Sequence, residues 1–344
     1  MLTILKSAPS VPKSELFQEL AAQVEPEVDW LWHGYLAAGN VTLLISQWKT
    51  GKTTLLAVLL ARLHDGFELA GQAVRTGHAA VISEESRVHW RMRGLRLDFA
   101  PRTRFFCRPF LGKPSYDEWQ ALIDHLAELR AEGGLDLVVI DTLSTFLPCG
   151  AENQPDALQR VLRPLERLTL AGVAVLLLHH PRKGVVSAGE TARGSGALTA
   201  YADIVLELTY YRRLRREDRR RRLSAWSRHT QTPPELIIEL SSDGYDYTAA
   251  PDIDEDVART LEVVRTMLES RQQQMSRAVL RGSWPEDPKP SMTTLWRHLE
   301  RGVEVGQLAR NGAGHSDDPF RYTLPGVDLP WKLDVIDIAA GYMP

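Results

Sequence analysis

The sequence predicts an α/β fold in which a mostly parallel sheet carries helices on both faces, followed by a small second module. Three observations support this prediction. Short continuous apolar runs, typical of buried parallel strands, alternate with segments of helical periodicity. The pattern then changes to successive candidate strands. Helical periodicity resumes only after an acidic stretch, which indicates a separate module.

The alternating strands and helices occupy the first half of the chain. Each apolar run has the length of a strand, and the stretches between the runs repeat apolar residues at the 3.6-residue period of a helix. Alternation of this kind places helices on both faces of a parallel sheet. The expected strands are residues 41–45, 79–83, 136–140 and 173–178, and the expected helices are residues 53–63, 87–97, 116–131 and 154–170.

A second group of expected strands extends the sheet at one edge. Asp243-Gly244 supplies a hairpin turn between the last two of them. Pro251 and the acidic residues 252–256 then form a linker, which places a domain boundary near residue 252. The strands are residues 203–209, 221–227, 235–240 and 245–248. The chain thus divides into an N-terminal extension (1–29), a main domain (30–251), a second module (252–325) and a tail (326–344).

The second module has the element order of a winged helix. A helix at 257–269 is followed by a turn at 283–285, a helix from Ser291 to Arg301, and a glycine-rich hairpin that closes at 320–322. Ser291 is a suitable N-cap. Once Leu295 and Leu299 face the core, Thr294, Arg297, His298 and Arg301 are left on a polar face, with Arg297 and Arg301 as candidate nucleic-acid contacts. Such a face fits DNA and a protein partner equally, and both alternatives stay open.

A phosphate-binding loop is expected where the first strand meets the first helix. The segment Ser46-Gln47-Trp48-Lys49-Thr50-Gly51-Lys52-Thr53-Thr54 follows an apolar strand and opens an apolar helix, as such a loop requires. Backbone N–H groups of the loop bind phosphate oxygens, Lys52 would bridge the β and γ phosphates of ATP, and Thr53 would ligate Mg²⁺. Ser46 stands where the pattern has its first glycine, so this position must avoid a positive φ or accept strain.

Chemically active side chains follow three other expected strands, on the side where open α/β sheets bind ligands. Asp141 is the expected carboxylate on the Mg²⁺ side, with a helix cap as the alternative. Glu84 or Glu85 could activate the water that attacks the γ-phosphate, with a solvated acidic turn as the alternative. His179-His180 ends the third strand, and a histidine there can hydrogen-bond the γ-phosphate or that water.

These residues, in this order, resemble the RecA-like family that includes the RepA-type hexameric replicative helicases of plasmids and related mobile-element ATPases. The resemblance covers residues 30–247 and implies a RecA-like ATPase domain over 30–251. It further implies that Glu84 is the catalytic base and His180 the γ-phosphate sensor. The matching segments are 48–53, 82–85, 138–144, 178–183 and, most specifically, 193–198 with Asp203 after it.

The resemblance also implies a ring, with a hexamer as the expected assembly and with active sites shared between subunits. Arg193 would be a finger that reaches a neighbour's nucleotide. Arg228 matches a second basic position that acts in trans in RecA-like ring helicases, and Ser227 stands where a lysine often precedes it.

Two basic segments are candidates for nucleic-acid binding. Arg182 and Lys183 lie in the loop after His180, which in RecA-like proteins is expected to touch single-stranded DNA; a solvated loop is the alternative. The Arg-rich run at 212–222 includes acidic residues and joins two expected strands, so a solvated hairpin is favoured there.

Composition is typical of a globular protein of the cytoplasm. A hydrophobic share of 44% and a charged share of 25% exclude wholesale disorder and collagen-like structure. Cys107 and Cys149 lack partners at metal-ligand spacing, so neither a disulfide framework nor a zinc site is expected. The start of the chain lacks the apolar core of a signal peptide, and no membrane span is expected. With a net charge of −3, nucleic-acid binding would depend on local patches.

The sequence therefore leads to two hypotheses. The first is a Mg²⁺-dependent ATPase ring that translocates on single-stranded DNA as a helicase. The second is a RecA-like ATP switch that binds DNA or protein partners in a mobile-element, regulatory or defence setting without unwinding. Both use the same phosphate chemistry, so the sequence does not separate them.

Overall fold

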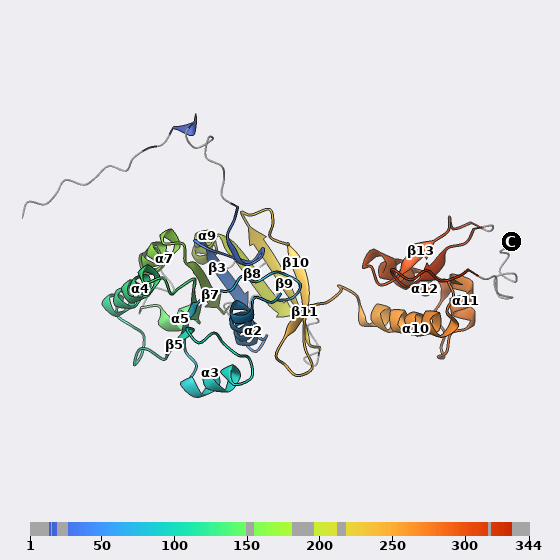
Figure 1. Ribbon diagram of the computed structural model, residues 1–344, viewed down its shortest axis with the longest axis horizontal. Helices are drawn as coiled ribbons and strands as arrows, with labels where there is room; N and C mark the ends of the chain where they lie inside the picture. The colour runs from blue at the N-terminus through green and yellow to red at the C-terminus, as the bar shows by residue number, and fades with distance from the viewer. Residues whose placement is uncertain are drawn as a thin grey trace, which may run out of the picture. The chain divides into compact units, whose positions relative to one another are not determined.

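The computed structural model describes residues 27–148, 155–180, 196–211, 218–315 and 318–331, together with Ser14 and residues 16–18. The chain divides into two compact units, Met1–Ala249 and Ala250–Pro344 (Figure 1). Among the described residues, no helix combines the length and the apolarity needed to cross a bilayer.

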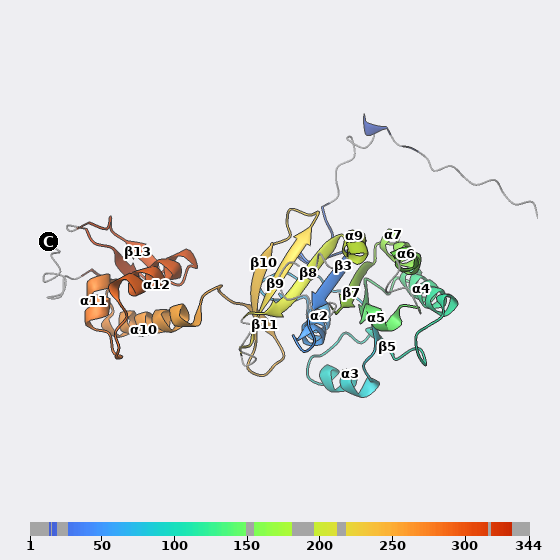
Figure 2. The same cartoon turned by 180° about the vertical axis from the view of Figure 1, so that it is seen from behind.

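The first unit is built around a nine-stranded, mostly parallel sheet. The strands from β8 to β5 run parallel, and β9, β10 and β11 extend the β8 edge by antiparallel pairing (Figure 2). A separate antiparallel pair precedes the sheet, formed by β1 (Trp30–Trp32) and β2 (Leu36–Ala37). From edge to edge the strands are β11 (Tyr247–Ala249), β10 (Glu235–Leu240), β9 (Arg220–Ser227), β8 (Ile204–Tyr210), β3 (Val41–Ser46), β7 (Ala174–His179), β6 (Leu137–Asp141), β4 (Ala79–Ser83) and β5 (Arg104–Cys107).

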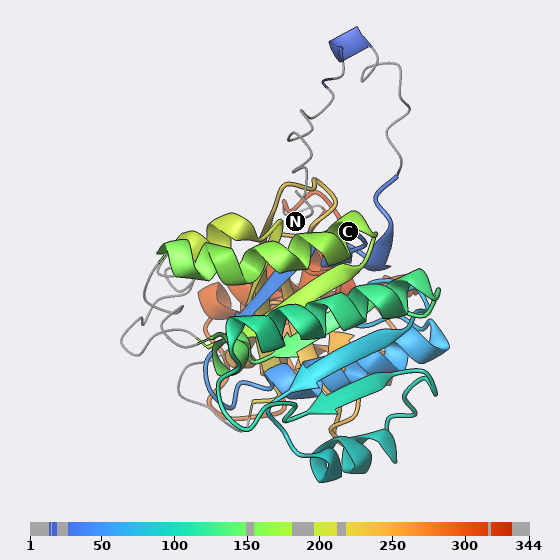
Figure 3. The same ribbon diagram turned by 90° about the vertical axis from the view of Figure 1, so that its left-hand side faces the viewer.

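Helices cover both faces of this sheet (Figure 3). Successive side chains of β3 point to opposite faces, so Leu43 packs in one core and Leu44 in the other. Because both faces are buried, the central strands are apolar along most of their length. One face carries α2 (Lys52–Asp65) and α3 (Arg87–Gly94). The other carries α4 (Tyr116–Ala131), α5 (Leu143–Phe146), α6 (Pro155–Leu162), η2 (Arg163–Leu165), α7 (Glu166–Leu170) and α9 (Gly196–Tyr201).

The large, mostly parallel sheet with its covering helices confirms the predicted α/β fold, but several elements differ from the prediction. The short elements β1, β2, α5 and α9 were not expected. The helix expected at 87–97 ends at Gly94, a residue of low helix propensity. The helix expected at 154–170 is divided into α6, η2 and α7 around Pro164, which has no N–H to donate. The edge strand β5 was not expected, because it has four residues and all of them are only partly buried.

The second unit packs three helices against a small antiparallel sheet. The helices are α10 (Glu255–Arg271), α11 (Arg277–Gly282) and α12 (Met292–Glu304), and the strand order is β12 (Met275–Ser276), β14 (Arg321–Thr323) and β13 (Ala309–Asn311). Their shared core includes Val264, Leu295, Leu299 and Tyr322.

The helix α12 begins at the expected N-cap, since Ser291 Oγ accepts a hydrogen bond from the Thr294 N–H at 3.0 Å. His298 was expected on the exposed polar face of this helix. Instead its Nδ1 lies 2.8 Å from Thr260 Oγ1 of α10, so the ring is turned into the helix–helix contact. The elements β12 and α11 were not expected, because they are too short to show a period.

Candidate functional site

The expected phosphate loop lies between β3 and α2, at the carboxyl end of the parallel strands. Ser46 is the last residue of β3 and pairs with Leu208 of β8, so the serine in the glycine position is part of an extended strand. The positive φ angles fall later, at Lys49 (63°) and Gly51 (108°). They turn the chain so that α2 begins directly at Lys52.

The first turn of α2 is suited to binding an anion. Its N-cap is Gly51, and within the described part of the chain no side chain caps the turn. The helix α4, by contrast, is closed by a capping box between Ser115 and Glu118. The first N–H groups of α2 therefore keep their hydrogen-bonding capacity, and the helix dipole favours a phosphate oxygen beside them.

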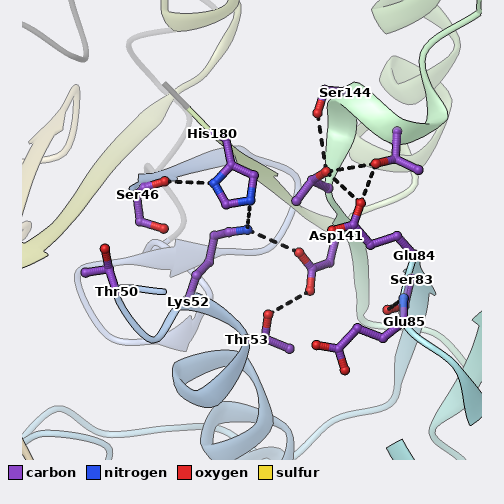
Figure 4. Close-up of polar contacts among 12 residues, drawn as sticks. Ser46, Thr50, Lys52, Thr53, Ser83, Glu84, Glu85, Asp141, Ser144 and His180 are labelled. Carbon is purple, nitrogen blue, oxygen red and sulfur yellow. Dashed lines mark hydrogen bonds and ion pairs between the residues drawn. The ribbon is translucent and has the colours of Figure 1, made fainter. Parts of the chain in front are cut away.

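Lys52, Thr53 and Asp141 meet beside this turn (Figure 4). Lys52 Nζ lies 3.3 Å from Asp141 Oδ1, and Thr53 Oγ1 donates to Asp141 Oδ2 at 3.2 Å. Burial raises the pKa of Asp141 above its ordinary value, while the positive charge of Lys52 opposes that rise. The ammonium group suits a phosphate, and the hydroxyl and carboxylate oxygens suit Mg²⁺. Asp141 does not cap the next helix, since the N-cap of α5 is Thr142.

His180 lies on the other side of Lys52 (Figure 4). Its Nδ1 is 3.1 Å from the Ser46 carbonyl oxygen. A carbonyl oxygen only accepts, so we assign the proton to this nitrogen. In the neutral ring Nε2 is then an acceptor, and Lys52 Nζ lies 3.4 Å from it. The imidazole is held against the phosphate loop, as a γ-phosphate sensor would be.

Glu84 lies beside Asp141 at the ends of two neighbouring strands. Its backbone N–H donates to the Asp141 carbonyl oxygen at 2.9 Å. Its side-chain Oε2 accepts from Thr142 Oγ1 at 3.3 Å and also from Thr145 Oγ1. Two hydroxyl groups from the start of α5 thus hold the carboxylate in place.

Glu85 is committed to a different partner. Its two carboxylate oxygens accept from the guanidinium of Arg93 on α3, with 3.1 Å between Oε1 and Nη2. Neither glutamate is the freely solvated turn residue of the alternative interpretation. Of the two, Glu84 is the one that contacts the strand of Asp141.

Three residues that the sequence analysis did not single out contact the loop from β8, β9 and β11. Tyr210 and Arg221 donate hydrogen bonds to loop carbonyls, and Tyr247 packs against Gly51. Arg221 belongs to the Arg-rich run at 212–222, which was expected to be solvated. The run gave no indication of this contact, because the bond joins residues 171 positions apart in the sequence.

Of the arginine and lysine candidates in the first unit, the structure describes Arg228. Arg228 is 76% exposed and lies 3.7 Å from Asp203. It follows Ser227, which pairs with Ile204 at the amino end of β8. The phosphate loop follows the carboxyl end of β3, so Arg228 lies at the opposite end of the parallel strands from its own loop. The remaining candidates, Arg193, Arg182 and Lys183, lie outside the described residues.

The two candidates in the second unit have different surroundings. Arg301 is partly buried and donates to the Asp252 carbonyl oxygen at 2.8 Å and to Glu304 at 2.9 Å. Arg297 is exposed. Arg301 thus contributes to the packing of its own unit, and Arg297 is the member of the pair that faces solvent.

Comparison with models of known protein families finds a match for the first unit. A family model described as AAA domain matches residues 6–185, which is more than half of the 344-residue chain. The matched range contains the phosphate loop, Glu84, Asp141 and His180. No curated protein matches the sequence.

Proposed function

The chain belongs to the AAA domain family of P-loop ATPases, and from this premise we propose that it is a Mg²⁺-dependent ATPase ring that moves along single-stranded DNA as a helicase. One observation carries the proposal. The phosphate loop, a buried lysine, two carboxylates and a histidine converge from the ends of α2, β4, β6 and β7. Every residue type that ATP hydrolysis needs within one subunit is present in that group.

Each side chain has a role that its contacts support. Lys52 would bind the β and γ phosphates and follow the charge that develops on the γ-phosphate. Thr53 and Asp141 would hold Mg²⁺, which when bound neutralises charge on the phosphate oxygens. Glu84 would accept the proton of the attacking water, with its carboxylate oriented by Thr142 and Thr145.

The position of Arg228 supports the proposed ring. An arginine near the amino ends of the parallel strands cannot reach a nucleotide that its own subunit binds at their carboxyl ends. It can instead meet a neighbour's nucleotide in a head-to-tail assembly. The resemblance to RepA-type helicases adds Arg193 as a second arginine acting in trans, a hexamer as the assembly, and Arg182 and Lys183 as contacts to single-stranded DNA.

For the second unit we propose a winged helix. Its element order of helix, strand, two helices and two strands, with antiparallel pairing of the last two strands, supports this assignment. The exposed Arg297 on α12 would then contact DNA phosphates or bases.

The second candidate function is the ATP switch without unwinding, and one feature of α12 favours it. Met292 and Trp296, four residues apart on this helix, are 38% and 42% exposed. Exposed aromatic and methionine side chains are enriched at protein interfaces. A protein partner on this face would suit a switch whose nucleotide state controls assembly.

Turnover and unwinding should be measured together. ATPase activity of the full chain is compared with and without single-stranded DNA, alongside strand separation of a forked duplex. A helicase should show DNA-stimulated turnover and ATP-dependent unwinding, both lost in Lys52→Ala. Turnover without unwinding would favour the switch, and no turnover under any condition would contradict both ATP-driven functions.

A further inference from the structure

Two side chains from the neighbouring strands β8 and β9 reach the phosphate loop. Tyr210 on β8 and Arg221 on β9 are directly opposite each other in the strand register. The Tyr210 hydroxyl donates to the Lys49 carbonyl oxygen at 2.8 Å, and Arg221 Nε donates to the Thr50 carbonyl oxygen at 2.7 Å. The two side chains also contact each other: the Arg221 guanidinium makes a cation–π contact with the Tyr210 ring, 4.6 Å from the ring centre.

These bonds act on a part of the loop whose backbone is otherwise disfavoured. Lys49 has a φ of 63°, a left-handed conformation that residues with a Cβ adopt only at a cost. Such a conformation persists where surrounding contacts determine it. A peptide unit is planar, with its N–H opposite its C=O, so holding the Thr50 carbonyl also fixes the direction of the Gly51 N–H. That N–H is directed away from β9.

A third residue closes the outer side of the loop. The hydroxyl oxygen of Tyr247, on β11, lies 3.0 Å from the position that a Cβ on Gly51 would occupy. Gly51 also has a φ of 108°, so both its conformation and its surroundings require glycine. The loop is therefore held from β8, β9 and β11, all of which follow the segment that the AAA family model matches.

We propose that Tyr210 and Arg221 are positioning residues that hold the loop in its phosphate-binding conformation before the nucleotide arrives. This inference rests on the proposed binding of ATP at the loop. A loop that is already ordered loses less conformational freedom on binding, so the pair raises the affinity for ATP and ADP. If the pair served only to stabilise the sheet, its loss would lower the unfolding temperature and leave nucleotide affinity unchanged.

The test uses two substitutions, each of which removes one hydrogen bond to the loop; Arg221→Gln also removes the guanidinium bonds to the Asp218 and Arg220 carbonyl oxygens. Tyr210→Phe deletes the hydroxyl and keeps the ring that stacks on Arg221, and Arg221→Gln removes the guanidinium. Two matched controls lie in the same unit. Tyr201→Phe deletes a tyrosine hydroxyl that donates to the Leu162 carbonyl oxygen at 2.9 Å. Arg222→Gln removes the neighbouring arginine of β9, which pairs with Glu235.

Dissociation constants of Mg-ATP and Mg-ADP are measured by calorimetry on the full chain, well below the unfolding midpoint of every variant. We expect Tyr210→Phe to weaken both nucleotides about three- to tenfold and Arg221→Gln about tenfold or more, since a bond from a charged donor contributes more. In the double variant the dissociation constants should rise by less than the product of the two single-variant increases, because both bonds hold the same loop. KM should rise more than kcat falls. The dissociation constants of the two control variants should stay within about twofold of wild type, since neither removed bond involves the loop.

The outcomes separate this inference from the function on which it rests. A wild-type chain that binds no ATP would contradict both the proposed ATP site and the positioning role. Wild-type binding with unchanged affinity in Tyr210→Phe and Arg221→Gln, or an equal loss in the two controls, would overturn the positioning role alone.

Discussion

At the scale of the residue, Lys52 and Asp141 depend on each other. Both are buried, with 6% and 2% of their surface exposed, and neither charge is easily held there without the other. A nucleotide would add phosphate charge beside Lys52, and Mg²⁺ would add positive charge beside Asp141. Bound Mg-ATP would therefore replace the Lys52–Asp141 ion pair with two interactions, Lys52 with phosphate and Asp141 with Mg²⁺.

Lys52→Ala should lower ATP turnover by at least about a hundredfold and weaken ATP affinity, because it removes the point charge that stabilises the γ-phosphate in the transition state. Phosphate release is the measurement. Lys289→Ala is the matched control, since this exposed lysine of the second unit donates to the Gly282 carbonyl oxygen at 3.0 Å and has no part in the loop. Equal turnover in wild type and Lys52→Ala would refute the site.

Glu84→Gln should leave ATP bound and slow hydrolysis by about two to four orders of magnitude, the usual range for loss of a general base. Single-turnover hydrolysis and ATP affinity are measured in parallel. Glu85→Gln is the control: it weakens the ion pair with Arg93 and should affect stability more than chemistry. A larger catalytic defect in Glu85→Gln would show that Glu84 is not the base.

The sequence was sufficient to locate the candidate site residues that come soon after a strand. Lys52, Glu84, Asp141 and His180 could be found because each follows a short apolar run, and parallel strands bring their carboxyl ends together. The contacts that orient these groups could not be found in the same way. Tyr210 and Arg221 reach the loop across 161 and 171 positions of sequence, and that distance is closed only by the pairing of β8 with β3.

At the scale of the element, long and regular segments were predicted well and short ones were not. The helix α4 and the strand β10 have the expected bounds. The missed elements are short, and in elements this short the burial pattern is set by neighbours rather than by a visible period. They are the strands β1, β2, β5 and β12 and the helices α5, α9 and α11. Element ends shifted where Gly94 and Pro164 interrupt helical hydrogen bonding.

The contact between α10 and α12 should make the second unit sensitive to pH. Burial lowers the pKa of His298 below its ordinary value of 6.5, and the charge of Arg297 adds to that effect, while Asp254 and Asp256 oppose it. The folded unit therefore binds the proton more weakly than the unfolded chain does. Its stability should be complete above the unfolded pKa and should decrease as the pH falls below about 6.5.

Urea unfolding of the full chain between pH 8 and pH 5.5 tests this expectation. His298→Gln keeps a hydrogen-bonding side chain beside Thr260 and should flatten the dependence. The exposed His315 is the control, and His315→Gln should retain the wild-type slope. An identical slope in wild type and His298→Gln would contradict the assignment.

At the scale of the whole molecule, the proposed ring makes two defective chains complementary. Arg228→Ala and Arg193→Ala should each lower turnover about a thousandfold or more with ATP affinity nearly unchanged, because an arginine in trans stabilises the transition state of the neighbour's site. Mixing either variant with Lys52→Ala should restore part of the turnover, since some interfaces then combine an intact loop with an intact arginine.

Native mass measurement must first show that mixed assemblies form. If Arg228 only pairs with Asp203 of its own chain, Arg228→Ala should lose little turnover and mixing should restore nothing. Mixed assemblies without recovered turnover, or a chain that stays monomeric with ATP, Mg²⁺ and single-stranded DNA, would count against shared sites.

The central place of β3 in the sheet has a consequence for biosynthesis. This strand is complete at Ser46, but its partners β7 and β8 begin only at Ala174 and Ile204. During translation β3 and the apolar helix α2 therefore leave the ribosome with both strand edges unpaired, and an unpaired apolar strand is a template for aggregation. Closing so long a loop is also slow compared with local pairing. The segment that would bind ATP is therefore synthesised well before the strands that pair with it, and β3 is paired on both sides only after residues 174–210 have left the ribosome.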